Sequence, residues 1–304
     1  MKNVIVIGGS MFTGRVFSIM ASRNEGYDLY VVNRGNHPMN LDRVHQYTSD
    51  RHDVERVASL IPDKNFDTLI DFCAYNPGEI EQIIKSLGKR IKQYIFFSTA
   101  SIYHPADGFL DENAQIIDIT ENSTDFVNDY IRNKVILENE LIVACEKAGI
   151  GYTILRPAFI YGPFNYAPRE PYFIELIAKR TPVPVPIDST SRYNFIYVMD
   201  IADILMNLIG DARGYNKVYN LAGDEAITYE SLISEFRRLH KEPILTRDVT
   251  VSQVETENIP LPFPLTGDTL YDGSMYRLAF DHRFTPFSVG MEKTFQIFHT
   301  LYTT

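Results

Sequence analysis

Tyr130 and Lys134, in the stretch FVNDYIRNKVILENEL, have the residue types and the spacing of a proton-transfer pair. Residues four apart lie on one face of a helix, so the phenol and the ammonium are neighbours if this stretch is helical. A tyrosine hydroxyl titrates near pH 10, but a neighbouring positive charge favours its phenolate form. Lowering the tyrosine pKa by about three units takes roughly 4 kcal/mol. The pair therefore suits general acid–base catalysis at an alcohol carbon.

A third polar side chain stands where a predicted strand ends. The stretch QYIFFS predicts a buried strand over residues 93–98, and Thr99 follows it directly. In an open α/β sheet, the carboxyl ends of parallel strands face the ligand crevice. Thr99 would hold a substrate hydroxyl in line with Tyr130, which makes Thr99, Tyr130 and Lys134 the candidate catalytic set. The alternative is that Tyr130 only packs its ring on the sheet.

The stretch VIVIGGSMFTGR, residues 4–15, predicts a strand, a glycine turn and a helix that begins near Gly14. Such a loop binds a pyrophosphate because free N–H groups and the helix dipole point at it. Met11 stands where the G-x-x-G-x-x-G pattern has its middle glycine. That replacement is acceptable if Met11 has a negative φ and its side chain points away. We therefore expect a dinucleotide site here, and an ordinary glycine-rich turn is the alternative.

The end of the second strand concerns the choice of dinucleotide. The stretch LYVVNRGN places Asn33 where an acidic residue bonds the adenosine ribose in NAD-binding folds. Asn33 does not repel a phosphate, and Arg34 is a residue type that pairs with a 2′-phosphate. The sequence therefore favours NADP slightly over NAD, unless Arg34 is only a solvated loop charge.

Short β-branched runs alternate with helical stretches through the first half of the chain. We expect strands at 3–7, 28–32, 67–72, 93–98 and 152–156, and helices near 14–24, 52–60, 77–87 and 124–148. This alternation predicts a doubly wound α/β fold with a parallel Rossmann sheet. After residue 161 the chain becomes rich in proline and aromatic residues. We expect an NAD(P)-binding domain from 1–162 plus about 193–222, interleaved with a smaller substrate-binding lobe from 163–192 plus 223–304.

Composition limits the classes of partner. The chain has 304 residues and a net charge of −10, which argues against nucleic acid or an anionic membrane as partner. No stretch approaches the ~20 apolar residues that span a bilayer, and a strand follows Met1 almost directly, so we expect a cytoplasmic protein without a signal peptide. Its two cysteines fit a reduced core, and its histidines lack metal-ligand spacing, so no metal is expected.

Taken in order, six segments of the chain resemble the extended short-chain dehydrogenase/reductase family, which includes NAD-dependent epimerases, dehydratases and reductases of nucleotide sugars. GGSMFTG is similar to its phosphate loop, and FSTASIY to its Ser/Thr strand end. Tyr130 and Lys134 match its catalytic pair. The other matching segments are ILRPAFIYGP, NFIYVMDIAD with KVYNLAG, and LYDGSMYRL. The resemblance covers nearly the whole chain.

The resemblance also implies roles for individual residues. Asp50 and Arg51 would flank the adenine, and residues 73–75 would line the nicotinamide side. The implied cofactor-binding residues are Gly8, Ser10, Met11, Phe12, Thr13, Gly14, Asn33, Arg34, Asp50, Arg51, Cys73, Ala74, Tyr75, Lys134 and Pro157. The implied substrate contacts are Ser101, Phe159, Arg192 and Arg277.

Three departures from the family pattern limit what carries over. Ala100 and Ser101 stand where the dehydratase branch has an acidic pair, which argues against sugar dehydration. Tyr193 occupies the usual position of an arginine that grips a substrate diphosphate, with Arg192 displaced by one residue. Met11 is typical of a subgroup that includes chloroplast proteins that bind RNA without dehydrogenase activity.

The sequence thus supports two hypotheses. The first is an NAD(P)-dependent epimerase or reductase acting on a sugar or nucleotide sugar, with a small molecule as its partner. The second is a non-catalytic dinucleotide-binding protein of the same fold, regulatory or RNA-associated. The intact Thr99, Tyr130 and Lys134 set and the acidic composition favour the first. A homodimer is left open.

Overall fold

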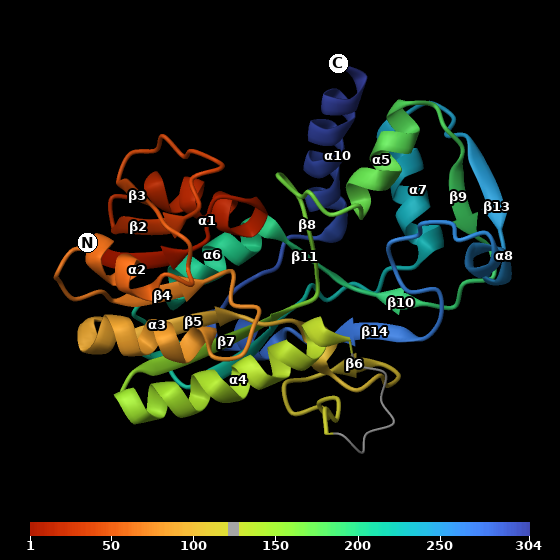
Figure 1. Ribbon diagram of the computed structural model, residues 1–304. Coiled ribbons are helices and arrows are strands. Elements are labelled where there is room, and N and C mark those ends of the chain that lie inside the picture. Colours follow the sequence, from red (N-terminus) through yellow and green to blue (C-terminus); the bar gives the residue numbers. More distant parts are fainter. Residues whose placement is uncertain (121–127) are drawn as a thin grey trace.

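Seven parallel strands form the central sheet of the computed structural model, which describes residues 1–120 and 128–304 (Figure 1). Their spatial order is β12-β7-β5-β4-β1-β2-β3. The strands are β1 (Lys2–Ile7), β2 (Tyr27–Asn33), β3 (Val44–Thr48), β4 (Thr68–Asp71), β5 (Gln93–Phe97), β7 (Gly151–Pro157) and β12 (Lys217–Leu221). The chain order reverses between β1 and β4, which creates the crevice where such sheets bind ligands. The predicted doubly wound α/β fold is confirmed.

Helices cover both faces of the sheet, which explains why its inner strands are hydrophobic throughout. On one face, Val4 and Val6 of β1 join a core with α1 (Phe12–Ser22) and α6 (Val198–Leu208). On the other face, Ile5 and Ile7 pack with α2 (Val54–Leu60), α3 (Glu79–Leu87) and α4 (Asp129–Ala148). Alternate residues of one strand therefore anchor helices on opposite faces.

The expected helices begin or end within two residues of those observed, apart from the stretch 124–148. There the described helix α4 begins at Asp129, and 124–127 lie outside the described residues. The strand β3 was not predicted. It is an edge strand with the sequence VHQYT, and its side chains are all at least partly exposed, so it lacks the apolar run that marks the inner strands.

Residues from the second half of the chain build a separate aromatic core, at the right of Figure 1. The helices α5 (Glu170–Ala178), α7 (Tyr229–His240) and α10 (Phe287–Thr303) contribute to it. The same lobe has a β9 (Val183–Pro186) and β13 (Thr246–Val249) pair with the short helix α8 (Val251–Thr256). Below that pair lies a sheet of β10 (Arg192–Tyr193), β14 (Asp268–Tyr271) and β6 (Phe109–Leu110), the last from the first half of the chain. The rings of Phe173, Tyr193 and Phe263 stack at the centre of the aromatic core. The proposed boundaries of the two lobes stay a prediction.

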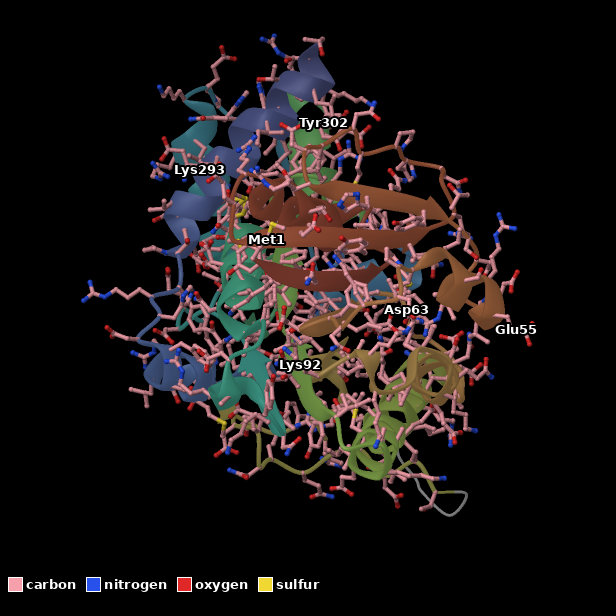
Figure 2. The ribbon with its side chains drawn as sticks, turned by 90° about the vertical axis from the view of Figure 1, so that its left-hand side faces the viewer. Met1, Glu55, Asp63, Lys92, Lys293 and Tyr302 are labelled. Atoms are coloured by element: carbon pink, nitrogen blue, oxygen red, sulfur yellow. The ribbon has the colours of Figure 1, made fainter. Side chains whose placement is uncertain are left out.

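Two short strands, β8 (Phe159–Tyr161) and β11 (Phe195–Tyr197), pair where the chain passes from the large sheet to the aromatic core. Helix α9 (Ser274–Phe280) packs beside β12. The side view in Figure 2 shows α10, with Lys293 and Tyr302, at the opposite side of the molecule from Glu55 of α2. Among the described residues, none of the helices combines the length and the apolar character needed to cross a bilayer.

Candidate active site

The turn after β1 has the backbone geometry of a phosphate cradle. Gly8 and Gly9 have φ values of +95° and +73°, which side chains other than glycine rarely adopt. A Cβ on Gly14 would lie 2.5 Å from the Cα of Gly9, so the first turn of α1 can approach this loop only with glycine there. Met11 has a φ of −130° and an exposed side chain, which meets the condition set for a non-glycine residue. The loop therefore fits a pyrophosphate at the start of α1.

The carboxyl end of β2 holds an amide donor without a partner. Asn33 is buried, and its Oδ1 accepts hydrogen bonds from the Gly35 N–H at 2.8 Å and Gln46 Nε2 at 3.0 Å. Its Nδ2 is buried and finds no partner in the described part of the chain. Arg34 is exposed beside it, and its charge helps to lower the pKa of Asp50. The side-chain groups at this end of the strand that can still bind a ligand, Asn33 Nδ2 and the Arg34 guanidinium, are therefore hydrogen-bond donors.

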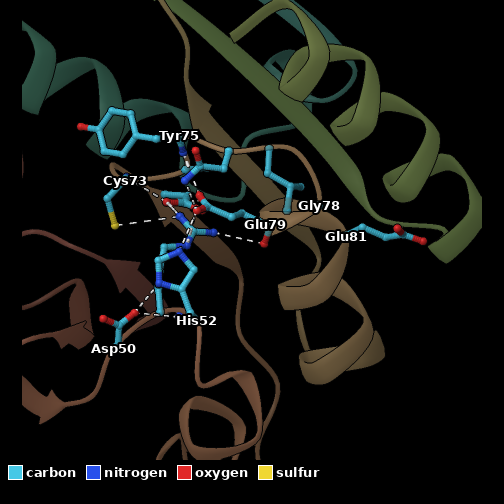
Figure 3. Close-up of polar contacts among 12 residues, drawn as sticks. Asp50, His52, Cys73, Tyr75, Gly78, Glu79 and Glu81 are labelled. Atoms are coloured by element: carbon cyan, nitrogen blue, oxygen red, sulfur yellow. Dashed lines mark hydrogen bonds and ion pairs between the residues drawn. The ribbon is translucent and has the colours of Figure 1, made fainter. Parts of the chain in front are cut away.

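Asp50, expected near the adenine, is tied to the next residues of the chain (Figure 3). Its Oδ1 accepts from the His52 N–H at 2.9 Å and lies 2.6 Å from His52 Nδ1. The other ring nitrogen of His52 lies 2.8 Å from Glu79 Oε1. Hydrogen bonds from His52, first from its backbone, lower the pKa of Asp50, whereas the hydrogen bonds with Glu79 and Asp50 raise that of His52.

The side chain of Arg51 turns inward from the same loop, and the expectation that Arg51 flanks the adenine stays a prediction. Its guanidinium is buried and donates to Asp71 Oδ1 at 2.9 Å and to the Glu79 carbonyl at 3.1 Å. Asp71 has no exposed surface and also accepts from the Tyr94 hydroxyl at 2.6 Å. Burial opposes the arginine charge, but Asp71, together with Tyr94, Cys73 and Glu79, keeps the pKa of Arg51 above its usual value. The guanidinium is therefore committed to protein carboxylates rather than free for a ligand.

Residues 73–75, expected on the nicotinamide side, follow β4 at the carboxyl edge of the sheet. The Cys73 N–H donates to Asp71 at 2.9 Å, and the Tyr75 N–H donates to Glu79 at 2.8 Å. Burial raises the pKa of the Cys73 thiol to about 12, so it is not a reactive thiolate. The same buried carboxylates that hold Arg51 thus also fix this turn.

Lys134 lies inside this edge and links three elements. It is buried, and its Nζ donates to the carbonyl of Ala74 at 2.9 Å and to that of Phe97 at 2.7 Å. The Nζ is also 4.8 Å from the ring centre of Tyr75 and 5.8 Å from that of Tyr130. Burial lowers its pKa to about 8. Two of the three ammonium protons are therefore used within the protein, which leaves one for a ligand.

The structure brings Thr99 and Tyr130 together at the same edge. Thr99 is buried after β5, its Oγ1 accepts from the Ser101 N–H at 3.2 Å, and it acts to lower the pKa of the Tyr130 phenol. The Tyr130 ring lies 6.5 Å from that of Tyr75 and remains 46% exposed, so the phenol is reachable from outside. The side chain of Asn128 accepts from the Ile131 N–H at 2.9 Å and caps α4 six residues before Lys134.

Within the protein alone, packing around the Tyr130 phenol raises its pKa, and Thr99 and the charge of Arg169 act in the opposite direction. Lys134 directs its ammonium at two carbonyl oxygens. The expected lowering of the Tyr130 pKa by Lys134 together with a positive nicotinamide stays a prediction. The cation that affects Tyr130 comes from the substrate loop, here defined as residues 162–169.

Sequence reasoning missed the residues of this loop that face the site. Tyr166 packs edge-on against Phe12 of the phosphate loop, with ring centres 6.3 Å apart, and the Arg15 guanidinium lies 5.4 Å from the Phe164 ring. Arg169 lies over the Phe159 ring at 5.2 Å. The proline-rich stretch YGPFNYAPREPYF predicts a loop over a crevice, but it carries no signal for which of its side chains enter the site.

Of the other expected substrate contacts, two lie near Thr99 or Arg169 and two are arginines that face carboxylates. Ser101 is exposed two residues after Thr99, and Phe159 lies beneath Arg169. Arg192 forms a two-point ion pair with Asp268, at 2.9 and 2.5 Å. Arg277 lies in α9, with its Nε 3.9 Å from Asp224. Both arginines thus already face a carboxylate. Pro157, implied as a cofactor contact, is buried at the end of β7.

Metal chemistry finds no support in the described ranges, 1–120 and 128–304, where His, Cys, Asp and Glu side chains do not gather in groups of three or more that could hold an ion. The residues expected to hold a dinucleotide, by contrast, lie along one edge of the sheet.

Residues 4–222 match the sequence profile described as the NAD dependent epimerase/dehydratase family. The chain belongs to this family. Membership confirms the predicted extended short-chain dehydrogenase/reductase class and an NAD-type cofactor for the family. It does not by itself identify the substrate or the role of any single residue.

Two curated relatives of this family member differ in what their names describe. A protein of Arabidopsis thaliana named chloroplast stem-loop binding protein of 41 kDa b is 27% identical over 245 residues, 76% of this chain and 61% of that protein. A UDP-glucose 4-epimerase of Vibrio cholerae is 20% identical over 182 residues, 59% of this chain and 53% of that protein. The chain thus spans between half and two thirds of the length of these relatives.

Solved structures of epimerases share the fold over the whole chain. A UDP-glucuronic acid 4-epimerase variant from Bacillus cereus, with NAD bound, has a TM-score of 0.79 at 16% identity and covers 99% of this chain and 100% of its own. A UDP-N-acetylglucosamine 4-epimerase from Methanobrevibacter ruminantium has a TM-score of 0.79 at 19% identity, with 99% of each chain covered. At these identities the likeness concerns the fold alone.

Proposed function

We propose that the protein is an NAD(P)-dependent enzyme that oxidises or reduces a carbinol carbon of a sugar or nucleotide sugar, as an epimerase or a reductase. The observation that carries this proposal is the shared sheet edge. Thr99 and the glycine loop follow β5 and β1, on either side of β4, and Lys134 of α4 reaches this edge through the Ala74 and Phe97 carbonyls. Tyr130, one turn before Lys134 on α4, has a phenol whose pKa Thr99 acts to lower. That edge is where open α/β sheets bind dinucleotides.

Each of these residues has a distinct role in the proposed reaction. The loop of Gly8, Gly9 and Gly14 binds the pyrophosphate, and the nicotinamide supplies a hydride acceptor when it is bound. Lys134 holds the ribose with its remaining ammonium proton. Tyr130 takes the proton of the substrate hydroxyl as the carbinol is oxidised, and Thr99 positions that hydroxyl. Because packing raises the Tyr130 pKa, a positive charge near the phenol is needed for it to act as a base.

For the cofactor we propose NADP as the preferred dinucleotide, although the Bacillus cereus and other solved neighbours are named with NAD. The support is the unpartnered Asn33 Nδ2 and the exposed Arg34 at the end of β2. Both are donors, which suit a 2′-phosphate better than a hydroxyl that needs an acceptor.

The proposed function is tested by incubating the purified protein with UDP-hexoses deuterated at the reacting carbon, with either NAD or NADP. Mass spectrometry then follows the label. An epimerase yields the inverted sugar with deuterium retained, because the same hydride returns to the other face. A reductase transfers the label between sugar and free cofactor. Absence of both, with intact dinucleotide binding, would overturn the enzymatic proposal.

The Arabidopsis relative supports a second candidate, a protein of this fold that binds an RNA stem-loop. The net charge of −10 weighs against it, since phosphate backbones are bound by clustered positive charge. Fluorescence anisotropy with a labelled stem-loop RNA at low and high salt decides between the two candidates. Micromolar, salt-dependent binding supports the RNA-associated function, whereas no binding at low salt excludes it.

A further inference from the structure

Arg169 is an arginine that forms no ion pair with a carboxylate in the described part of the chain. It ends the substrate loop just before α5 and is half-buried. Its polar contact within the described chain is a long one, 3.5 Å from Nη1 to the Ile160 carbonyl, and its flat face lies over Phe159. None of the described carboxylates forms an ion pair with it. Burial lowers its pKa, which is the sign of a charge that is held out of water without full compensation.

Two other buried arginines, Arg51 and Arg156, each form an ion pair with a carboxylate of the protein. Arg51 pairs with Asp71, and Arg156 makes a two-point pair with Glu138 at 3.0 and 2.7 Å. A buried charge left unpaired costs several kcal/mol, so a structural arginine is expected to bring its own carboxylate. Arg169 is the exception among these three, which indicates that its counter-ion comes with a ligand.

The nearest candidate within the chain, Glu170, is already engaged elsewhere. Its carboxylate has no exposed surface and accepts the Gly162 N–H at 3.0 Å and Asn165 Nδ2 at 2.8 and 2.9 Å. These bonds join the start of the substrate loop to its end. Glu170 therefore fixes the position of Arg169 without an ion pair to it, and its charge only partly offsets the effect of burial on the Arg169 pKa. The guanidinium is thus held in place before any ligand binds.

Arg169 lies near Tyr130, the residue proposed to take the proton at the reacting carbon. Its guanidinium lies over Phe159, which follows β7, and β7 pairs with β5, at whose end Thr99 stands. The charge of Arg169 also acts on the phenols of Tyr130 and Tyr166. Arg192 and Arg277, the arginines expected as substrate contacts, lie elsewhere and face Asp268 and Asp224. An anion bound by Arg169 is therefore close to the group that Tyr130 deprotonates.

We propose that Arg169 determines substrate choice by binding an oxyanion carried on the sugar ring, a carboxylate or a phosphate ester, next to the carbon that reacts at Tyr130. This inference rests on the proposed function, whose site it deepens. The planar guanidinium can bind either oxyanion through two parallel hydrogen bonds. The substrate class is thus an acidic sugar or its nucleotide derivative rather than a neutral hexose.

The test compares ligands that differ only in the oxyanion. Calorimetry measures binding of UDP-glucuronic acid and UDP-glucose to the cofactor-loaded protein, with a hexose phosphate as a third probe. We expect UDP-glucuronic acid or the hexose phosphate to bind at least about tenfold more tightly than its neutral counterpart, UDP-glucose or the free hexose. Which of the two shows the preference identifies the carboxylate or the phosphate as the oxyanion.

Variants then assign the preference to Arg169. Arg169→Gln should abolish it and leave UDP-glucose affinity unchanged, whereas Arg169→Lys should retain part of it. Arg180→Gln, on an exposed arginine that pairs with Glu242, is the matched control and should behave as wild type. Thermal unfolding checks that each variant is folded.

Two results would overturn the inference. One is equal affinity of the wild type for acidic and neutral ligands, or binding of none of the oxyanion probes. The other is an equal loss for UDP-glucose and UDP-glucuronic acid in Arg169→Gln, which would mean that Arg169 binds the diphosphate. In both cases the proposed function stands if label transfer is still observed, and it fails separately if dinucleotide binds but no hydride moves.

Discussion

Arg51 and Arg169 show how differently the two sides of the candidate site are built. At the sheet edge, Arg51 is buried among Asp71 and Glu79, and these carboxylates also fix the turn over residues 73–75. In the substrate loop, Arg169 lacks such a partner, and the adjacent carboxylate holds the backbone of the loop instead. A buried charge that is paired within the chain stabilises the fold, whereas a charge that lacks a partner in the chain is available to bind a ligand.

Lys134 lies between these extremes. Two carbonyl oxygens hold its ammonium in a fixed direction, none of the described carboxylates forms an ion pair with it, and burial lowers its pKa to about 8. Lys134 therefore supports the sheet edge and still has one ammonium proton that it can donate to a ligand. The difference between the two arginines predicts that substitutions on the two sides of the site have effects of different size.

The largest expected effect on stability concerns Arg51. Arg51→Met leaves Asp71 buried without its counter-ion and should lower the free energy of unfolding by about 3–5 kcal/mol. Arg169→Met is the matched variant, and it should change stability by less than about 1 kcal/mol or increase it, because no partner is stranded. Urea denaturation measures both. Equal losses in the two variants would refute the contrast between the two sides.

A smaller effect is expected from the anchor of the substrate loop. Burial raises the pKa of Glu170 from 4.5 in the unfolded chain to about 7, so the folded state binds the extra proton between these values. Stability should therefore fall by about 3 kcal/mol in total from this group as the pH rises from 4.5 to about 7. Glu170→Gln should remove that decline.

Urea midpoints at a series of pH values check the Glu170 prediction. Glu175→Gln serves as the control, since Glu175 is an exposed partner of Lys179 on the same helix. The same pH dependence in Glu170→Gln and in wild type would show that Glu170 is not the titrating anchor.

The smallest expected effect is on cofactor choice. Arg34→Ala should weaken NADPH binding by about tenfold and leave NADH nearly unchanged, because one charge-assisted hydrogen bond to the 2′-phosphate is lost. Arg23→Ala, on an exposed arginine at the other end of α1, should alter neither affinity. Fluorescence titration of both cofactors measures this, and a wild type that clearly prefers NADH would show that Arg34 is only a loop charge.

The sequence predicted most of the fold because the inner strands are continuous apolar runs and the glycine loop is local in sequence. The spacing of Gly8 and Gly14 was enough to predict the glycine loop, and the helix period was enough to place Tyr130 and Lys134 on one helix face. The edge strand β3 escaped prediction because one half-exposed polar strand resembles a loop.

The direction of a side chain and its distant partners could not be predicted in the same way. The side chain of Arg51 points inward because it pairs with Asp71, 20 residues away in the sequence. The influence of Arg169 on Tyr130 depends on packing between segments 39 residues apart in the numbering and on a loop held by Glu170. No local pattern records such contacts, so the substrate side of the site was predicted less completely than the cofactor side.

The central claim, that Tyr130 moves the proton during hydride transfer, is tested most directly by single-turnover kinetics of Tyr130→Phe. The protein is loaded with oxidised cofactor and mixed with the sugar nucleotide, and absorbance reports the reduced nicotinamide. The account predicts that reduction slows by about 10²–10⁴-fold while cofactor affinity is unchanged, with Tyr152→Phe behaving as wild type. Reduction at the wild-type rate in Tyr130→Phe, or none in the wild type with any acidic or neutral sugar nucleotide, would contradict it.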